Sequence, residues 1–406
     1  MIGPSIFSFS SSSSNEDQPW FYDSFPFSDF SELFTENVSL QSEEWKNHPE
    51  TLGSLTKNET ERLFTLISPH ISDFIDRAKK SKYKTCFVKK ACGQKLPRPL
   101  LVKDDGSIYM NFTKKDQDRQ IGSSEKKTAW LGCNILTGEP IAILKPVYTK
   151  TFSDLEKNQT FLHEYEMTKK CLKDPKLSLA VYKSEKGKEK IRMTETFYAE
   201  GEFFDFIERN WNSLTLTQIM RIFAELVEDL EKIHNENIVH NDLKPENIFL
   251  LGGRVYIRDF DLARPADCFN RNVRVGTIHY SAPEKFRSNK YEIGKPSDVF
   301  SLALIICILL YSNLEENSDN YFCANPWMQL WDDYDMDDSV KPAVLENLSY
   351  DWAEEFLPEE KRIYHPSLHQ LLMEMLHPHP GKRPDIFQIK TCLEKISSNL
   401  PADSLA

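Results

Sequence analysis

Two stretches of the chain place hydrophobic residues at helical spacing, each along one face of a helix. The first lies between residues 55 and 80, where Pro69 predicts a kink or a break. The second lies near the middle of the chain. The apolar positions are Leu63, Leu66, Ile67, Ile71, Phe74 and Ile75 in the first stretch and Ile219, Ile222, Phe223, Leu226, Leu230 and Ile233 in the second. The longest apolar run, Val299 to Tyr311, is too short to cross a bilayer and indicates a buried helix.

Shorter apolar runs separated by turn residues predict strands from Ile108 onward. The turn Thr137-Gly138-Glu139 lies between two such runs, so it predicts a hairpin with Lys145 on its second strand. A second hairpin is expected around Gly252-Gly253, flanked by the runs 248–250 and 255–257. Residues 82–103 are basic and interrupted by prolines, which predicts a connector.

The second hairpin is preceded and followed by polar residues at fixed intervals, namely Asp242, Lys244, Asn247 and Asp259. The hairpin brings Asn247 and Asp259 close together, and two such oxygen ligands suit a hard cation such as Mg²⁺. Asp242 is then available as a base. Any one of these residues alone is more often part of an Asx turn.

This set resembles the catalytic core of eukaryotic-type protein kinases, whose H-R-D loop carries the base and whose D-F-G carries a metal ligand. Further landmarks follow in order: the segment 276–284 (GTIHYSAPE), then Asp298 before the apolar run, then Arg383. The resemblance implies an α+β, two-lobed protein kinase-like fold with a small β-rich N-lobe and a larger, mainly α-helical C-lobe. It also implies that Thr277 contacts Asp242 and Lys244, that Asp298 accepts hydrogen bonds from the catalytic-loop backbone, and that Arg383 pairs with Glu284.

In the small lobe, which the family builds from five strands, the resemblance assigns Lys145 to the α- and β-phosphates of ATP, held by Glu164 of the following helix. Glu166 is the alternative partner, and only one of the two can face the site. A lone strand lysine is otherwise commonly an exposed charge. Two features depart from the family pattern. Where G-x-G-x-x-G should cover the phosphates, the chain has Gly122, Ser124 and Lys127, so this loop is expected to bind ATP less closely unless Lys126 or Lys127 supplies compensating charge. The small residue expected two positions before the lysine is Ile143, with Ala142 one position early, an offset that a bulge would remove.

The resemblance places the hinge between the lobes at residues 191–203. Counting back from Gly201-Glu202 makes Glu195 the gatekeeper; a slip of one residue makes it Thr194 instead. The backbone of Thr196 and Tyr198 then meets the adenine edge, and Glu202 is a candidate for the ribose hydroxyls. Ile121 and Gly122 above the nucleotide, and Phe249 beneath the adenine, complete the expected ATP contacts.

Composition limits the compartment and the partners. The net charge of −12 argues against nucleic acid as an obligatory partner. The eight cysteines form no CxxC pair, and no basic, apolar leader opens the chain, so a reducing cytoplasm is expected, with delivery into another cell left open.

Five regions are expected: a disordered acidic tail (1–54), a helical extension and connector (55–107), the N-lobe (108–197), the C-lobe (198–398) and, within it, an acidic insertion (313–365). The tail carries eight carboxylates and no Lys or Arg before Lys46. Tail and insertion are each interpreted as solvated segments, with docking of a basic partner as the alternative.

The expected activity is that of a Ser/Thr protein kinase using ATP and Mg²⁺ on a protein substrate, with no membrane insertion. Lys244 and the segment 276–284 are typical of the Ser/Thr class. Since Asn241 replaces the arginine that binds a phosphate, and 262–275 holds no Ser, Thr or Tyr, activity is expected without activation-loop phosphorylation. The alternatives are a kinase-like scaffold with little turnover, suggested by the missing glycines and by Asp261, and a small-molecule phosphotransferase.

Overall fold

The computed structural model describes most of two compact units, one formed by residues 1–165 with 174–197 and one by 166–173 with 198–406. The described residues are 57–111, 120–124, 126–136, 139–148, 154–184, 186–196, 201–210, 214–267, 276–286, 293–311, 352–353 and 365–398. The predictions for the tail 1–54, for Tyr198 and for nearly all of the insertion 313–365 lie outside these residues.

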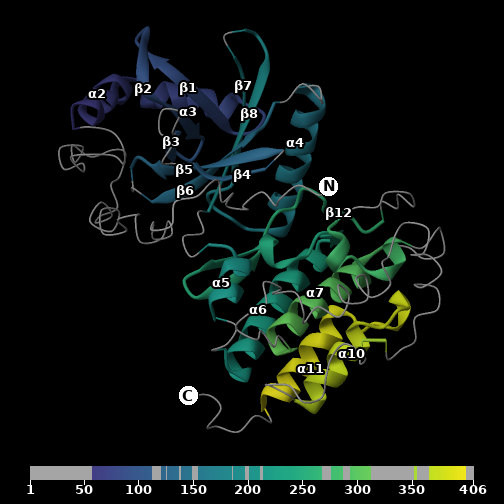
Figure 1. Ribbon diagram of the computed structural model, residues 1–406. Coiled ribbons are helices and arrows are strands. Elements are labelled where there is room, and N and C mark those ends of the chain that lie inside the picture. The colour runs from purple at the N-terminus through teal and green to yellow at the C-terminus, as the bar shows by residue number, and fades with distance from the viewer. Residues whose placement is uncertain are drawn as a thin grey trace, which may run out of the picture. The chain divides into compact units, whose positions relative to one another are not determined.

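Within its described residues, the first unit is built on one antiparallel sheet of eight strands (Figure 1). In spatial order the strands are β1 (Thr85–Ala91), β2 (Gln94–Lys103), β3 (Ile108–Asn111), β5 (Lys127–Asn134), β6 (Pro140–Pro146), β8 (Glu189–Thr196) and β7 (Ser178–Lys183), while β4 (Gln120–Ser123) pairs with β5. The β5–β6 hairpin predicted from the sequence is confirmed. Its register runs without a shift from Lys127 opposite Pro146 to Cys133 opposite Pro140.

The two edge strands of this sheet, β1 and β7, lie side by side. The Thr85 hydroxyl donates a hydrogen bond to the Leu179 carbonyl, and the Phe87 ring stacks on Tyr182 with 4.0 Å between centroids. The sheet therefore curls on itself. Its enclosed face collects one apolar cluster: Leu101, Tyr109, Trp130, Ile141, Ile143 and Ala180.

Strands β1 and β2 show that the predicted connector at 82–103 is wrong. The sheet has eight strands in the described part of the chain, where the family resemblance implied five. The connector was predicted because Pro97 and Pro99 cannot donate a backbone hydrogen bond to a neighbouring strand. Both lie in an irregular interval of β2, between Lys95, which pairs with Lys90, and Leu100, which pairs with Val88. A bulge thus accommodates the prolines without ending the strand.

The first predicted helix is confirmed, and it breaks at Pro69 as expected. It consists of α2 (Lys57–Ile67), a 3₁₀ turn (Ser68–His70) and α3 (Ile71–Lys80). The apolar faces of α2 and α3 pack on β1–β3. Helix α4 (Asp154–Cys171) covers another part of the sheet, where Phe161 and Tyr165 contact Ala129, Leu144 and Met193.

The second unit is mainly helical and holds the largest core. Within its described residues, its α-helices and strands are α5 (Phe203–Asn210), α6 (Leu216–Asn235), β9 (Ile238–Val239), β10 (Ile248–Leu251), β11 (Arg254–Ile257), β12 (Arg264–Pro265), α7 (Lys295–Tyr311), α10 (Pro366–Met375) and α11 (Ile386–Ser398). Helix α7 is buried all round, as the apolar run predicts. Among the described residues, no helix has the length and apolar character needed to span a membrane.

Candidate active site

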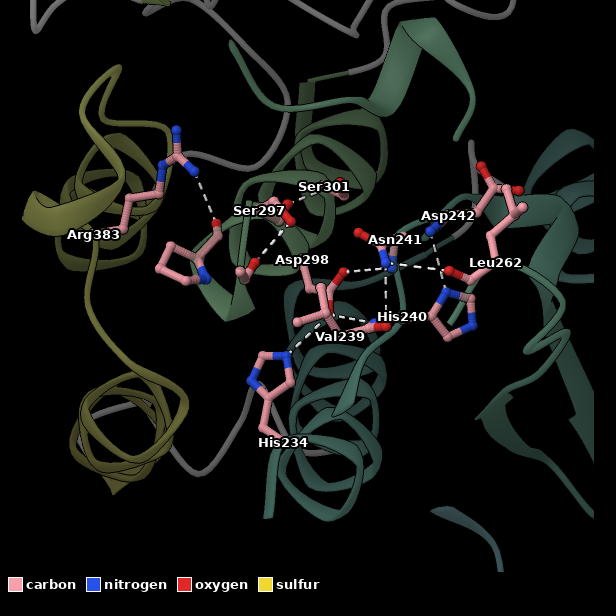
Figure 2. Close-up of polar contacts among 12 residues, drawn as sticks. His234, Val239, His240, Asn241, Asp242, Leu262, Ser297, Asp298, Ser301 and Arg383 are labelled. Carbon is pink, nitrogen blue, oxygen red and sulfur yellow. Dashed lines mark hydrogen bonds and ion pairs between the residues drawn. The ribbon is translucent and has the colours of Figure 1, made fainter. Parts of the chain in front are cut away.

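The catalytic loop of the second unit is anchored on Asp298, in the first turn of α7 (Figure 2). Its carboxylate accepts the backbone N–H groups of His240 (2.8 Å) and Asn241 (2.9 Å), and it lies 3.0 Å from His234 Nε2. Burial acts to raise the pKa of Asp298, but the hydrogen bond from His234 and nearby positive charges hold it below its usual value. An ionised carboxylate beneath the loop fixes the backbone immediately before Asp242.

Asp242 is held from two sides. Its Oδ1 accepts the Thr277 backbone N–H (2.7 Å) and the Thr277 hydroxyl (2.9 Å), while Lys244 Nζ lies 3.6 Å from its Oδ2. Lys244 also donates to the Thr277 hydroxyl at 2.9 Å. Burial acts to raise the pKa of Asp242, yet the Lys244 charge and the bonds from Thr277 keep it low. The carboxylate is therefore ionised and able to accept a proton.

The hairpin β10–β11 places Asn247 beside the start of the next segment. Ile248 pairs with Ile257, and the Arg258 N–H donates to the Asn247 carbonyl at 2.8 Å, so Asp259 follows one residue later. The Asn247 amide nitrogen donates to the carbonyl (2.8 Å) and the carboxylate (3.1 Å) of Asp242, which leaves the amide oxygen as a ligand atom. An amide oxygen and a carboxylate suit Mg²⁺, which binds proteins through few groups and completes its shell with water and phosphate oxygens.

The close of the segment 276–284 is tied to the same loop. Gly276 has φ +102°, and a Cβ there would come within 2.5 Å of the Asn241 carbonyl, so no larger residue fits. Lys285, buried, donates to that carbonyl at 2.6 Å. Glu284 forms a bidentate ion pair with Arg383 (2.7 and 2.8 Å), as the resemblance implies. This segment is thus bonded to Asp242 through Thr277 and to the core through Glu284.

In the first unit, the residue paired with Glu164 is Lys127, not Lys145. Lys127 Nζ makes a buried ion pair with Glu164 Oε1, and the two side chains are only 3% and 5% exposed. Lys145 Nζ instead lies over the Trp130 ring, 4.0 Å from its centroid. The predicted Lys145–Glu164 pair is corrected accordingly. The reason is strand register, because neighbouring residues of a strand point to opposite faces.

Two observations in the sequence point to Lys127. It occupies the third glycine position of the phosphate loop, and Ala142 stands one residue earlier than the family pattern requires for Lys145. Both observations agree with the family pattern if Ala142 and Leu144 are the residues of β6 that face α4. Residues Ser124 and Lys127 form a tight turn, in which the Ser124 N–H donates to the Lys127 carbonyl at 2.8 Å.

The structure also shows where the other residues expected to contact ATP lie. Glu195, buried, pairs with Ala142 in the sheet, and Thr194 pairs with Ile143. The Thr196 N–H donates to Asp174 at 2.8 Å, so this N–H is engaged within the protein. Gly122 pairs with Ala129, and the neighbouring Ile121 packs on the cluster that holds Phe161.

Glu202 and Phe249 lie together in the second unit, joined by an isolated β-bridge, and both are buried. Burial, with the charges of Asp205, Glu246 and Asp259, raises the pKa of Glu202 to about 10. Its Oε1 has no hydrogen-bond partner. The ribose contact of Glu202 expected from the sequence stays a prediction.

Comparison with known proteins places the chain in a family. A model described as "Protein kinase domain" matches residues 116–393. The match covers more than half of the chain, which therefore belongs to the protein kinase family.

Its relatives include serine/threonine-protein kinase ppk16 of Schizosaccharomyces pombe, 35% identical over 136 residues, covering 32% of this chain and 20% of that protein. The interferon-induced, double-stranded RNA-activated protein kinase of Mus musculus is 37% identical over 112 residues (27% and 21%). Eukaryotic translation initiation factor 2-alpha kinase 1 of Rattus norvegicus is 44% identical over 102 residues (21% and 16%). The matches span about a fifth of the length of these curated relatives.

Proposed function

We propose that this chain transfers the γ-phosphoryl group of Mg-ATP to a serine or threonine hydroxyl of a protein substrate. The observation that carries the proposal is the set of contacts around Asp242, where a largely buried, ionised carboxylate is held by Thr277, Lys244 and Asn247. Phosphoryl transfer requires mainly positioning and charge stabilisation, and these side chains supply both.

Each residue has a distinct role in the reaction. Asp242 orients the substrate hydroxyl and accepts its proton as the oxygen attacks the γ-phosphorus and the bond to the β-phosphate oxygen breaks. Lys244 stabilises charge on the transferring group. Asn247 and Asp259 hold Mg²⁺, which neutralises charge on the phosphates. A lysine of the first unit, paired with Glu164, holds the α- and β-phosphates.

The contacts of Thr277 favour this function over the two alternatives. A small-molecule phosphotransferase generally lacks the segment 276–284, and here that segment bonds directly to Asp242. The scaffold alternative is disfavoured because Asp242, Asn247 and Asp259 are all present, together with a lysine paired with Glu164. A protein hydroxyl is therefore the favoured acceptor.

Activation-loop phosphorylation is not required on this proposal. In place of an arginine, Asn241 donates its side-chain N–H to the Leu262 carbonyl at 3.2 Å. Strand β12 pairs with β9, with Arg264 opposite Val239, and the Ala266 N–H donates to the Asn237 carbonyl at 2.7 Å. Uncharged hydrogen bonds thus hold the start of the segment where a phosphate would otherwise order it.

Replacement of the base tests the function. Asp242→Asn should lower phosphoryl transfer to generic basic protein by ~10²–10⁴ while nucleotide affinity changes little, because Asp242 is not a metal ligand. Asp76→Asn, an exposed carboxylate on α3, is the matched control and should behave as wild type. Wild-type turnover in purified Asp242→Asn would show that the base is wrongly assigned.

A further inference from the structure

Lys127 and Lys145 are both strand lysines beside the phosphate loop, and the structure distinguishes them by the face of the sheet on which they lie. One face carries Ala129, Leu144 and Met193, packed against Phe161 and Tyr165 of α4. The enclosed face carries Trp130, Ile143 and Ala180. The alternation is strict, because Ala129 and Trp130 are neighbours in β5, and Leu144 and Ile143 are neighbours in β6.

Lys127 lies on the face of α4. It is two residues before Ala129 in β5, so its side chain points to the same side, and its ammonium group reaches Glu164. Lys145 is one residue after Leu144 and two after Ile143, so it points to the enclosed face, where it covers Trp130. No register shift occurs in the β5–β6 pairing that could turn Lys145 toward α4.

The position that faces Glu164 from β6 is therefore Leu144. The resemblance to the family expects a small residue and then the lysine, two positions apart on one strand face. Ala142 and Leu144 have this spacing and share the α4 face. Leu144 stands where the lysine is expected, and an ammonium group delivered from the neighbouring strand takes its place beside Glu164.

A buried ion pair does not by itself indicate function, since replacing one with apolar residues is often neutral or stabilising. The location of this pair is what points to a ligand. Lys127 ends the phosphate loop at its third glycine position, and a glycine there would supply no charge. The loop therefore has a lysine in place of a glycine at this position, and β6 has no lysine on the face that packs against α4.

We infer that Lys127, positioned by Glu164, is the lysine that contacts the α- and β-phosphates of ATP, and that Lys145 is not. The inference rests on the proposed kinase function. The Lys127 ammonium is a compact point charge with three donors, so it can contact Glu164 and phosphate oxygens together. Lys145 stabilises the enclosed face of the sheet through its contact with Trp130.

A matched pair of substitutions tests the inference. Nucleotide affinity is measured by displacement of a fluorescent ATP analogue in Mg²⁺, and the KM for ATP and kcat are measured on basic protein. Lys127→Met should weaken nucleotide affinity at least tenfold and lower kcat/KM for ATP at least a hundredfold. Lys145→Met should stay within threefold of wild type in both. The reverse order, or equal losses, would overturn the inference.

Two further variants separate a role toward ATP from a role in folding. Lys127→Met leaves the Glu164 carboxylate buried without its partner, so Lys127→Met combined with Glu164→Gln removes both charges. This double variant should melt near the wild-type temperature and still bind nucleotide at least tenfold more weakly. If it binds nucleotide as wild type does, the pair is structural and the inference is wrong.

The second variant restores the family arrangement. Lys127→Gly with Leu144→Lys returns a glycine to the loop and a lysine to the α4 face of β6, so nucleotide affinity should recover to within about tenfold of wild type. Affinity as low as in Lys127→Gly alone would contradict the register argument. The binding measurements decide the inference even if wild-type protein transfers no phosphate, an outcome that would count against the proposed function alone.

Discussion

The family resemblance was used to interpret two regions: the catalytic loop of the second unit, and the face of the first unit's sheet that carries the lysine paired with Glu164. The contacts that it implies are present in the first region, whereas in the second region it selected the wrong lysine. In the second unit, Asp298, Thr277 and Arg383 make the contacts that the resemblance implies. In the first unit, the resemblance selected Lys145, and the structure pairs Glu164 with Lys127. The difference shows how much a one-residue offset matters in a strand, where it moves a side chain to the opposite face.

The loop is less sensitive to such offsets because its residues are fixed by backbone bonds from one buried group. Asp298 accepts two successive N–H groups and a hydrogen bond from a histidine nitrogen, which holds the backbone immediately before Asp242 in place. In the strands of the first unit, no comparable set of backbone bonds determines which position carries the lysine. A lysine on the α4 face of either strand, β5 or β6, would supply the charge beside Glu164, and here that lysine is on β5.

The largest effect on stability is expected from removing the Asp298 carboxylate, which anchors the loop backbone. Asp298→Ala leaves two backbone N–H groups and His234 buried without their acceptor, next to the buried Lys285. We expect a loss of ~3–5 kcal/mol in stability, as for breaking a buried charged network from one side. Denaturant unfolding measures it.

The matched control for Asp298→Ala is Asp385→Ala. Asp385 is exposed and accepts a single N–H, from Gln388 at 2.9 Å, at the start of α11. Its loss should cost ~0.5–2 kcal/mol, as for a helix cap. If both variants lose the same amount, Asp298 is not the anchor of the loop and the contrast between the two units disappears.

Much of the second unit was predictable from sequence for a physical reason. The hairpin around Gly252-Gly253 and the buried run of α7 depend on turn chemistry and on hydrophobicity that local sequence carries. The contacts of Thr277 with Asp242 were implied by the family resemblance. The strands β1 and β2 were missed because the bulge that accommodates Pro97 and Pro99 depends on pairing with a partner strand. From the sequence, Lys127 was considered only as a source of compensating charge in the loop. Its pairing with Glu164 was missed because the face on which a strand residue lies depends on register. Its signals in the sequence were its place at the third glycine position and the offset of Ala142.

A second prediction concerns Glu202, the buried carboxyl of the second unit. Folded, Glu202 keeps its proton up to a pKa of about 10, compared with an ordinary value of 4.5. Between these values the folded state binds more protons than the unfolded state, so this group makes stability fall as pH rises, by at most about 1.4 kcal/mol per pH unit. Glu202→Gln should remove this dependence.

Melting curves between pH 5 and pH 9 check the expectation for Glu202. The melting temperature of Glu202→Gln relative to wild type should rise steadily with pH. Glu394→Gln, on the exposed side of α11, serves as the control and should run parallel to wild type. A constant difference between Glu202→Gln and wild type across this range would show that Glu202 is ionised in the folded protein.

The smallest effect is expected from removing phosphate. This treatment tests whether the activation segment of the second unit is ordered without phosphorylation. The segment that begins at Asp259 is held by the Asn241 side chain and by the pairing of β12 with β9, none of which involves a phosphate. Thr277, the first hydroxyl of the segment, already bonds Asp242 and Lys244. Phosphatase treatment should therefore change activity by less than tenfold, with mass spectrometry confirming an unmodified peptide from Asp259 to Glu284. A tenfold or larger loss, ~1.4 kcal/mol on the barrier, that returns when phosphate is restored in this peptide would show that uncharged hydrogen bonds do not suffice to order the segment.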